Sequence, residues 1–513
     1  MEDARPLSKR AKTLTAAGAA VALLLSIWGA KPDAMPLVLP AGTGLLALGA
    51  LCWRSPWSRA VSVLLALAWS FNIMTTAVSK IVYSGLPSTY IAEAILATNR
   101  TEAAEMFWAN LEWLPAFAAL LAGFLALFAA LSRTLPARVL RGGALALAVL
   151  LGVLCVVHGV RHRSALQVTL RTTTKTPFFH AASLLGAHAS AKAQNAAGGL
   201  PPPVVARVAT DTGVEAHVLI IGESVRRRHL HLYGAARDTS PREDAERSRM
   251  LVFTQAVAPA GNTIAAIPRT LRPLDARGNF VAHPDDNIVV LANLAGMRTF
   301  WLSNQEDFNP NFAVITAIAA RAQTVAWNHR GDDDVLLPKL DAALKTPGRK
   351  LIILHLMGSH EPVASRFPET SRFFTGGDSR EDDYDNSLRH TDALLGKIFD
   401  RLRGERGSVL YYADHALVRK KQFWGWKYRH GGGVREAYEI PLWIWWAPPV
   451  AKPPRLGVEN APYSTGENYH LLRDWLGIET PGRPSPPSPL RAGWKPSPPV
   501  VDGGKRFDEL PPE

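Results

Sequence analysis

Long apolar stretches alternate with short polar segments in the first 160 residues. The apolar stretches cover about 13–30, 36–53, 60–79, 114–132 and 143–160. Each approaches the ~20 residues that a helix needs to cross the hydrocarbon core of a bilayer. The second stretch is interrupted by Gly42, Gly44 and Gly49, which transmembrane helices tolerate. Residues 1–160 are therefore predicted to form a transmembrane domain of five helices.

A different pattern starts near residue 216, where short β-prone runs alternate with helical segments. The strand candidates are 217–222, 288–292, 298–303, 350–356, 408–413 and 440–446. This alternation predicts βαβ units and a mainly parallel sheet with helices on both faces, over residues 216–478. Residues 161–215 end in GGLPPPVV and are predicted to be a linker. The Pro-rich tail at 479–513 is too poor in core-forming residues to fold, so we expect it to be extended or disordered.

Three of the predicted strands end in residues that bind metals or transfer protons. The runs are HVLIIGES at 217–224, KLIILHLMGSH at 350–360 and SVLYYADH at 408–415. In open α/β sheets, ligands bind outside the carboxyl ends of the strands. If the three strands are neighbours, Glu223, His360 and the pair Asp414-His415 lie around one crevice. Adjacent carboxylate and imidazole groups suit zinc, so a metal-dependent enzyme is the leading interpretation.

Each of these residues also has an ordinary structural interpretation. A Glu after a strand is commonly a helix cap, and Asp414 could cap the next helix beside an incidental histidine. The nucleophile is open as well, since both Ser224 and Thr263 carry a hydroxyl that a metal or base could activate. Thr263 opens the segment NTIAAIPRTL, which reads as a helix start suited to a phosphate. The same position would suit a threonine that only caps the helix.

Basic residues predict the orientation of the apolar stretches. They precede the first stretch, separate the second from the third, and separate the fourth from the fifth, as Lys9, Arg10, Lys12, Arg54, Arg59, Arg133, Arg138 and Arg141. By the positive-inside rule these segments are cytoplasmic, and five spans then place everything after about residue 161 on the opposite side.

Charge and cysteine content narrow the class of protein further. The 513 residues carry a net charge of +13, which on a membrane-anchored exported domain favours anionic headgroups or phosphorylated glycans over nucleic acid. The two cysteines, Cys52 and Cys155, fall inside predicted spans. The exported domain therefore has no disulfide and must be stabilised by its own core.

Several motifs together resemble one known family, the zinc-dependent phosphoethanolamine transferases of Gram-negative inner membranes, within the alkaline phosphatase and sulfatase superfamily. The matching pieces are TNRTEAAEMF, VLIIGESVRRRHLHLYGAARDTSP, GNTIAAIP, WLSNQ, HLMGSHEP, YDNSLRHTD, ADH, and RHGGG with YEIPLWIW. The resemblance covers most of residues 1–478. It implies a five-helix transmembrane domain and a periplasmic α/β domain with a three-layer αβα sandwich, anchored in the bacterial inner membrane.

The resemblance also implies roles for single residues. The zinc ligands would be Glu223, Thr263, Asp414 and His415, with Thr263 as the nucleophile. His360 and His430 would contact the substrate phosphate or a second metal ion. Thr98 and Glu102 would bind the ethanolamine headgroup of the donor.

The activity implied is transfer of phosphoethanolamine from phosphatidylethanolamine to a lipopolysaccharide or periplasmic glycan, through a phosphothreonine. The chain reads DHAL at 414–417 where the family usually reads DHGE, and Ala94 replaces an asparagine of some members. The lack of disulfides leans towards the branches that modify core sugars or glucans. Two rivals remain: a phosphoglycerol transferase or sulfatase-like hydrolase of the same superfamily, and a non-catalytic sensor or assembly factor. Neither Thr263 nor Ser224 lies in the C/S-x-P-x-R context of sulfatases.

Overall fold

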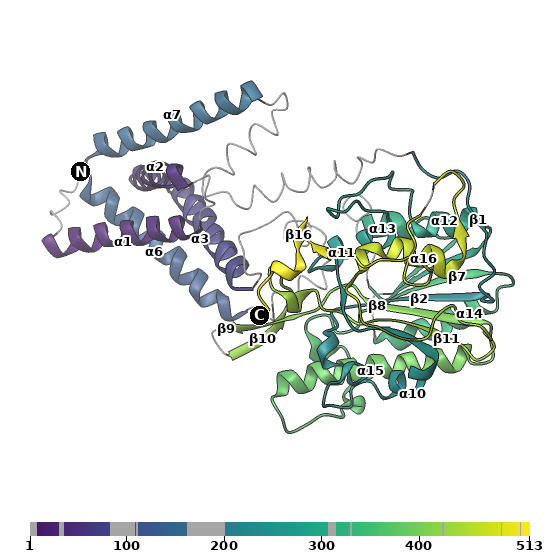
Figure 1. Cartoon of the computed structure of the whole chain (residues 1–513). Helices are drawn as coiled ribbons and strands as arrows, with labels where there is room; N and C mark the ends of the chain where they lie inside the picture. Colours follow the sequence, from purple (N-terminus) through teal and green to yellow (C-terminus); the bar gives the residue numbers. More distant parts are fainter. Residues whose placement is uncertain are drawn as a thin grey trace. The chain divides into compact units, whose positions relative to one another are not determined.

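The computed structural model describes residues 8–29, 35–82, 108, 111–161, 201–305, 314–328, 331–422, 425–483, 485–502 and 504–512. The chain divides into two compact units, one built from the helices up to residue 161 and one that contains residues 201–512 (Figure 1). Thr98 and Glu102 lie outside the described residues.

The first unit has a helix at each of the five predicted apolar stretches. These helices are α1 (Lys9–Gly29), α2 (Met35–Trp53), α3 (Arg59–Val82), α6 (Leu114–Thr134) and α7 (Ala137–Arg161), and a short 3-10 turn, η1 (Leu111–Trp113), precedes α6. Four are long and apolar enough to cross a membrane, whereas the apolar part of α2, Leu37–Trp53, is shorter. Four candidate spans are therefore found among the described residues, and the prediction of five is not confirmed.

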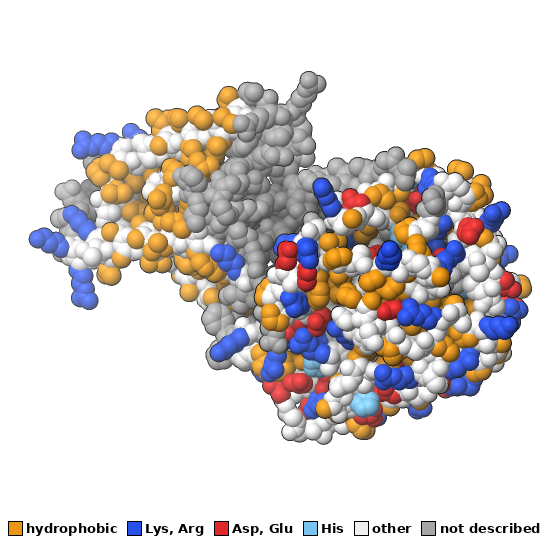
Figure 2. Space-filling view, in the orientation of Figure 1, with side chains coloured by type: hydrophobic (Ala, Val, Ile, Leu, Met, Phe, Trp, Pro, Cys, Tyr) orange, Lys and Arg blue, Asp and Glu red, His pale blue; other side chains and the backbone are white. Residues whose placement is uncertain are grey.

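The glycines of α2 are points of close helix contact. A Cβ atom on Gly44 would lie 2.6 Å from the Cβ of Leu147 on α7, and one on Gly49 would lie 2.5 Å from the ring of Phe128 on α6. Small residues of this kind let helices approach one another in a bilayer. Many outward side chains of the unit are apolar, for example Leu24, Leu64 and Leu145 (Figure 2). An apolar outer surface is the composition that lipid contact requires.

The second unit is built on an eight-stranded sheet with the order β12-β3-β11-β8-β2-β7-β5-β6. Its strands are β2 (Ala216–Gly222), β3 (Met250–Phe253), β5 (Arg298–Ser303), β6 (Thr324–Trp327), β7 (Lys350–His355), β8 (Gly407–Ala413), β11 (Leu442–Trp446) and β12 (Gly457–Glu459). β11 runs antiparallel to both neighbours, and all other pairs are parallel. The mainly parallel sheet is therefore confirmed.

Helices cover both faces of this sheet. They are α10 (Pro241–Glu246), α11 (Thr263–Leu271), α12 (Ile288–Leu294), α13 (Val314–Ala319), α14 (Leu337–Leu344), α15 (Ser379–Leu402) and α16 (Asn468–Leu476). Alternate residues of a strand point to opposite faces. On β2, Leu219 and Ile221 share a buried cluster with α11, α12, α13 and α16, whereas Val218 and Ile220 share another with α14 and α15. The unit is therefore a three-layer αβα sandwich (Figure 1).

One predicted strand is wrong. Residues 288–292 begin the helix α12, because the Asn287 side chain accepts hydrogen bonds from the backbone N–H groups of Val289 and Val290, at 3.1 Å each. A short apolar run fits a buried strand and a buried helix equally well. The capping asparagine decides between them.

Four small sheets and several 3-10 turns complete the unit. The sheets pair β1 (Arg207–Val208) with β14 (Ile478–Glu479), β4 (Ala256–Val257) with β13 (Tyr463–Ser464), β9 (Val418–Gln422) with β10 (Gly425–Arg429), and β15 (Val500–Val501) with β16 (Lys505–Arg506). The turns are η2 (Arg227–His229), η3 (His231–Tyr233), η4 (Arg247–Arg249), η5 (Asp333–Leu336), η6 (Val363–Ser365), η7 (Glu369–Ser371), η8 (Arg435–Ala437), η9 (Thr465–Glu467) and η10 (Phe507–Glu509).

The Pro-rich tail is extended but ordered over its described residues, so the expectation of disorder is wrong there. Val501 is buried in a small apolar cluster, and Phe507 and Leu510 pack against the same cluster. Trp494 packs against the main core. The tail also accepts a 2.8 Å hydrogen bond from the Arg435 N–H to the Pro511 carbonyl. A few apolar anchors and backbone hydrogen bonds thus hold a segment whose composition argues against a core of its own.

Candidate active site

The three predicted strands with polar ends are neighbours in the sheet, as β8, β2 and β7. Glu223 follows the last residue of β2, and Asp414 follows the last residue of β8. In the parallel pairing of these strands Gly222 lies opposite Ala413, so the two carboxylates leave the sheet side by side. The predicted convergence of these strand ends is therefore found.

Thr263 reaches the same place from a different element. It is the first residue of α11, and the preceding Asn262 caps the helix by accepting a hydrogen bond from the Ala265 N–H at 3.0 Å. The Thr263 Oγ1 atom lies 2.9 Å from Glu223 Oε2 and 3.3 Å from His415 Nε2. Because Asn262 is the cap, the threonine hydroxyl is left to face the carboxylates.

His415 and Asp414 complete the group of residues predicted as zinc ligands. His415 Nε2 lies 3.3 Å from Glu223 Oε1 and 3.5 Å from Asp414 Oδ2. Glu223, Asp414 and His415 are almost completely buried, whereas Thr263 is partly exposed. The group thus opens to the surface through the threonine.

The two remaining predicted histidines line the same site. The His430 ring lies 4.8 Å from that of His415 and 5.3 Å from that of His360. Ligand atoms of Glu223, His415 and His430 all lie within 4.8 Å of one another, which brings His430 into a group that could hold a metal. Burial and the charge of His415 keep the pKa of His430 well below its usual value. A neutral imidazole is the form that binds metal ions.

A bound cation would stabilise the buried carboxylates of this group. Burial, followed by the negative charge of Glu223, raises the pKa of Asp414 to about 8. Burial alone would lower the pKa of His415, but the two carboxylates outweigh it and raise that pKa to about 9. Asp414 Oδ2 is buried without a hydrogen-bond partner among the described residues. Carboxylate oxygens, an imidazole nitrogen and a hydroxyl are ligands that zinc accepts, so the residues present fit a zinc ion.

The change from DHGE to DHAL leaves the metal-facing side of this group intact. His415 Nδ1 lies 3.2 Å from the Ala416 carbonyl oxygen, so an Nδ1–H can donate there while Nε2 faces Glu223 and Thr263. A backbone carbonyl makes this contact whatever side chain residue 416 carries. Ala416 and Leu417 are themselves buried in the main core.

Ser224 forms hydrogen bonds with the carboxylates of both Glu223 and Asp414. Its φ of 62° lies in the left-handed region, which is rare for a residue other than glycine. Its N–H donates to Asp414 Oδ1 at 3.1 Å, and its hydroxyl donates to Glu223 Oε1. Gln305, in the WLSNQ motif, donates to the other oxygen of Glu223 at 3.0 Å. These contacts engage Asp414 Oδ1 and both oxygens of Glu223, and they leave Asp414 Oδ2 without a hydrogen bond among the described residues.

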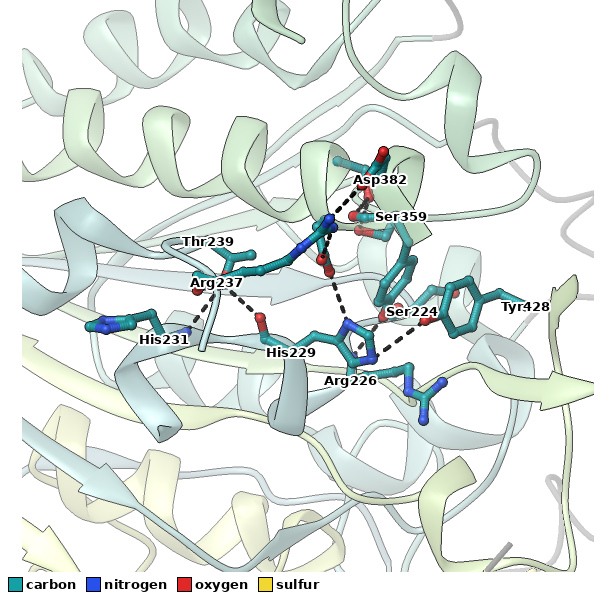
Figure 3. A network of polar contacts seen from close by, with 12 residues as sticks. Ser224, Arg226, His229, His231, Arg237, Thr239, Ser359, Asp382 and Tyr428 are labelled. Carbon is teal, nitrogen blue, oxygen red and sulfur yellow. Dashed lines mark hydrogen bonds and ion pairs between the residues drawn. The ribbon is translucent and has the colours of Figure 1, made fainter. Parts of the chain in front are cut away.

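Tyr384 in turn fixes the backbone of Ser224. Its hydroxyl donates to the Ser224 carbonyl at 2.7 Å and accepts from the Arg226 N–H at 2.8 Å. Figure 3 shows Ser224 and Arg226 within this polar network, next to Tyr428. Sequence reasoning missed the roles of Tyr384 and Gln305. Their only signal was their place in YDNSLRHTD and WLSNQ, two of the motifs that carry the family resemblance.

Replacing Tyr384 by Phe should weaken zinc binding by up to about 10-fold, because Tyr384 acts through Ser224, and direct hydrogen-bond partners of metal ligands contribute about 10- to 100-fold to affinity. The measurement is a competition titration of the purified full chain against a chromogenic zinc chelator. Tyr233→Phe is a matched control: the Tyr233 hydroxyl also donates to a carbonyl and accepts from an N–H, both of Leu442 on β11 and both at 3.0 Å. Equal zinc affinities of the two variants would contradict the role of Tyr384.

Comparison with known proteins agrees with the fold. The sulfatase family profile matches residues 216–478. The chain is 40% identical to YhbX of Escherichia coli K12 over 299 residues, which cover 57% of this chain and 54% of that protein. It is 32% identical to the phosphoethanolamine transferase OpgE of the same strain over 245 residues, 45% of each chain. The chain thus matches about half the length of these curated relatives.

Two solved structures share the fold. The membrane protein EptA of Neisseria meningitidis, a lipooligosaccharide phosphoethanolamine transferase, superposes with a TM-score of 0.62 at 16% identity, over 90% of this chain and 96% of that one. The periplasmic domain of EptC from Escherichia coli, solved in complex with Zn, superposes with a TM-score of 0.53 at 22% identity, over 61% of this chain and 98% of that one. The chain therefore belongs to the sulfatase family, and several curated relatives that it matches over about half their length are named phosphoethanolamine transferases.

Proposed function

We propose that this protein transfers phosphoethanolamine from phosphatidylethanolamine to a lipopolysaccharide or periplasmic glycan, through a phosphorylated Thr263. The observation that carries the proposal is the position of the Thr263 hydroxyl, 2.9 Å from Glu223 and 3.3 Å from His415 at the open side of a buried group of possible metal ligands. Ser224, the other candidate nucleophile, is completely buried and donates its hydroxyl hydrogen to Glu223. A substrate therefore reaches Thr263 and not Ser224.

Glu223, Asp414 and His415 would hold a zinc ion together with the Thr263 hydroxyl. When bound, zinc supplies a positive charge that lowers the pKa of the hydroxyl and neutralises the phosphate. The zinc complex of the related EptC domain supports this choice of metal. The position of His430 is compatible with a ligand of a second ion as well as with a contact to the substrate phosphate.

The chain's own residues would act in two steps. In the first, Thr263 Oγ1 forms a bond to phosphorus while its proton passes to Glu223, and the bond from phosphorus to the diacylglycerol oxygen breaks, with that oxygen taking the proton so that diacylglycerol leaves neutral. In the second, an acceptor hydroxyl, or a protonated oxygen of an acceptor phosphate, attacks the same phosphorus, the bond from phosphorus to Thr263 Oγ1 breaks, and the acceptor's proton passes through Glu223 to Thr263. Backbone N–H groups at the start of α11, with His360 and His430, stabilise the negative charge on the phosphate oxygens.

The proposed membrane location of the protein is based on its helical unit. Four candidate spans tether the domain to a membrane, where the diacylglycerol donor resides. We propose that α2 is a fifth span, and the basic segments between the apolar stretches then support a bacterial inner-membrane protein with the catalytic domain in the periplasm. Thr98 and Glu102 are proposed to bind the donor headgroup.

The test is to trap the covalent intermediate. The zinc-loaded full chain in detergent is incubated with phosphatidylethanolamine, and its mass and that of the peptide with Thr263 are measured. A gain of one phosphoethanolamine group on this peptide, with release of diacylglycerol, is expected. A phosphoglycerol group gained from phosphatidylglycerol instead would support the rival transferase, and no adduct with either lipid would reject the mechanism.

A second experiment, on glycans isolated from cells, identifies the acceptor. Mass spectra of the lipopolysaccharide and the periplasmic glucans are compared with and without the gene. The fraction that loses the phosphoethanolamine mass contains the acceptor.

A further inference from the structure

One residue of the C-terminal tail, Asp502, contacts the loop that leads to Thr263. It lies in the turn between β15 and β16, beyond residue 478, where the sulfatase match ends. Figure 1 shows β16 next to α11, the helix that begins with Thr263. The φ of Asp502 is 42°, in the left-handed region that few residues other than glycine adopt. Residues in such conformations are held there by their contacts and are common near functional sites.

Two loops of the active site meet backbone to backbone. The threonine loop, residues 259–263, ends in the proposed nucleophile, and the histidine loop, residues 430–433, begins with His430. A Cβ atom on Gly261 would overlap the Gly431 carbonyl oxygen, so this approach is open only to a residue without a side chain. The spacing between the nucleophile and the histidine therefore depends on how these two loops are held against each other.

The Asp502 carboxylate and the Tyr438 hydroxyl form a bridge between the two loops. On the side of the threonine loop, the Asp502 N–H donates to the Pro259 carbonyl at 3.1 Å, and Asp502 Oδ1 accepts from the Gly261 N–H at 3.4 Å. On the side of the histidine loop, Asp502 Oδ2 accepts from the Tyr438 hydroxyl, which itself accepts from the Gly433 N–H at 3.0 Å. Tyr438 is completely buried, and hydrogen bonds are stronger in such surroundings than in water.

The tail has other contacts that keep it in place without this carboxylate. Val501, next to Asp502, is buried in a small apolar cluster, and Phe507 and Leu510 pack against the same cluster. The antiparallel pairing of β15 with β16 closes the hairpin around the turn. The side chain of Asp502 is therefore engaged by the two loops and is not needed to anchor the tail.

We propose that Asp502 is a positioning residue for the transfer reaction. Together with Tyr438 it fixes the spacing between Thr263 and His430, so that both face the same phosphate. Its carboxylate is engaged by backbone N–H and hydroxyl groups, so it acts through the two loops and not on the substrate itself. This inference rests on the proposed function and gives a part in it to a segment outside the sulfatase match.

The test separates the rate of the reaction from the binding of the donor. In the zinc-loaded full chain in detergent, Asp502→Ala should lower the maximal rate of adduct formation from phosphatidylethanolamine about 10- to 100-fold. This is the range for a reacting group that is misplaced by up to about 1 Å. The donor concentration that gives half the maximal rate should stay unchanged, since the loss falls on the reaction and not on donor binding.

Two further variants test the bridge itself. Tyr438→Phe keeps the buried ring and removes the hydroxyl, so it should also slow the reaction, and adding it to Asp502→Ala should cause no further loss. Asp502→Asn should recover most of the rate, because its amide can still accept from the Gly261 N–H and can donate to the Tyr438 oxygen. Asp508→Ala is the matched control in the tail and should react like the wild type, since the Asp508 carboxylate pairs with Arg506.

Hydrogen exchange measures the bridge without catalysis. In the metal-free full chain, peptides that contain Gly261 or Gly433 should exchange faster in Asp502→Ala than in the wild type, because both N–H groups donate to the bridge. The same peptides of Asp508→Ala should exchange as in the wild type.

A wild-type rate of adduct formation in Asp502→Ala would overturn the proposal, whatever its exchange. So would a loss of rate that Asp508→Ala shares or that Asp502→Asn does not reduce, since either would assign the effect to the fold of the tail. Failure of the transferase proposal looks different. The wild type would then form no adduct, while exchange at Gly261 and Gly433 would still differ between the wild type and Asp502→Ala.

Discussion

Replacing Thr263 by Ala is expected to reduce phosphoethanolamine transfer by about a thousandfold or more, the scale on which loss of a covalent nucleophile acts. The hydroxyl is the partly exposed group of the site that faces both Glu223 and His415. Ser224 cannot replace it, because its side chain is completely buried. The measurement is release of diacylglycerol from phosphatidylethanolamine by the purified full chain, together with the mass of the protein.

Thr263→Ser is the matched control for this variant. Serine keeps the hydroxyl but loses the methyl group, so the adduct should still form, more slowly. Thermal unfolding of both variants checks that α11 remains folded, since the cap of that helix is the Asn262 side chain and not Thr263. An adduct in the Ala variant would show that another group is the nucleophile.

Replacing Asp414 by Asn is expected to remove both zinc and activity. Asp414 Oδ1 accepts hydrogen bonds from the N–H groups of Ser224 and His415, at 3.1 and 2.8 Å, and an amide oxygen can still accept both. The side-chain NH₂ group of asparagine then takes the place of Oδ2, and its amide nitrogen has no lone pair available for a metal. Zinc content of the purified variant, measured by atomic emission, should fall far below that of the wild type.

Without metal, the Asp414→Asn substitution should instead raise the thermal stability of the protein. In the folded, metal-free chain the pKa of Asp414 is raised from 3.8 to about 8. A carboxyl with a raised pKa costs stability once the pH exceeds its unfolded value, and the cost grows until the folded value is reached. Metal-free Asp414→Asn should therefore unfold at a higher temperature than the metal-free wild type, with a gap that widens between about pH 4 and pH 8.

Asp392→Asn separates these effects from the general effect of removing a buried charge. Asp392 lies on α15 and has a pKa raised to about 7 by burial. Its oxygens accept from the N–H groups of Arg242 and Glu243 on α10. This control should keep its zinc. Loss of zinc from both variants alike would mean that Asp414 is not a specific ligand.

The parts of the site that could be predicted from sequence are the residues that directly follow a predicted strand. The runs before Glu223 and Asp414 are apolar enough to specify buried parallel strands, and their polar ends then share an edge. Thr263 arrives from a helix, 40 residues after Glu223. Its meeting with Glu223 depends on packing across the domain. That contact was reachable only through resemblance to a family.

The predictions were wrong where the local hydrophobic pattern fits two kinds of element, or where only a few apolar residues hold a segment in place. The apolar run at 288–292 fits either kind of element, and the Asn287 cap makes it a helix. Tyr384 stabilises the site through two backbone groups, and hydrogen bonds to backbone leave no mark in residue spacing. The tail has the composition of a disordered segment, and single residues such as Trp494 and Val501 hold it in place.

The ordered tail bears on how the catalytic domain should be produced by itself. The sulfatase match ends at residue 478, a natural place to cut a soluble fragment. Asp502 lies beyond that cut, yet its N–H donates to the Pro259 carbonyl at 3.1 Å and its carboxylate accepts from the Tyr438 hydroxyl and, at 3.4 Å, from the Gly261 N–H. Pro259 and Gly261 form the loop that leads into Thr263. A fragment ended at 478 would release this loop and uncover Val257 and Val418, so soluble fragments should extend to Leu510 or beyond.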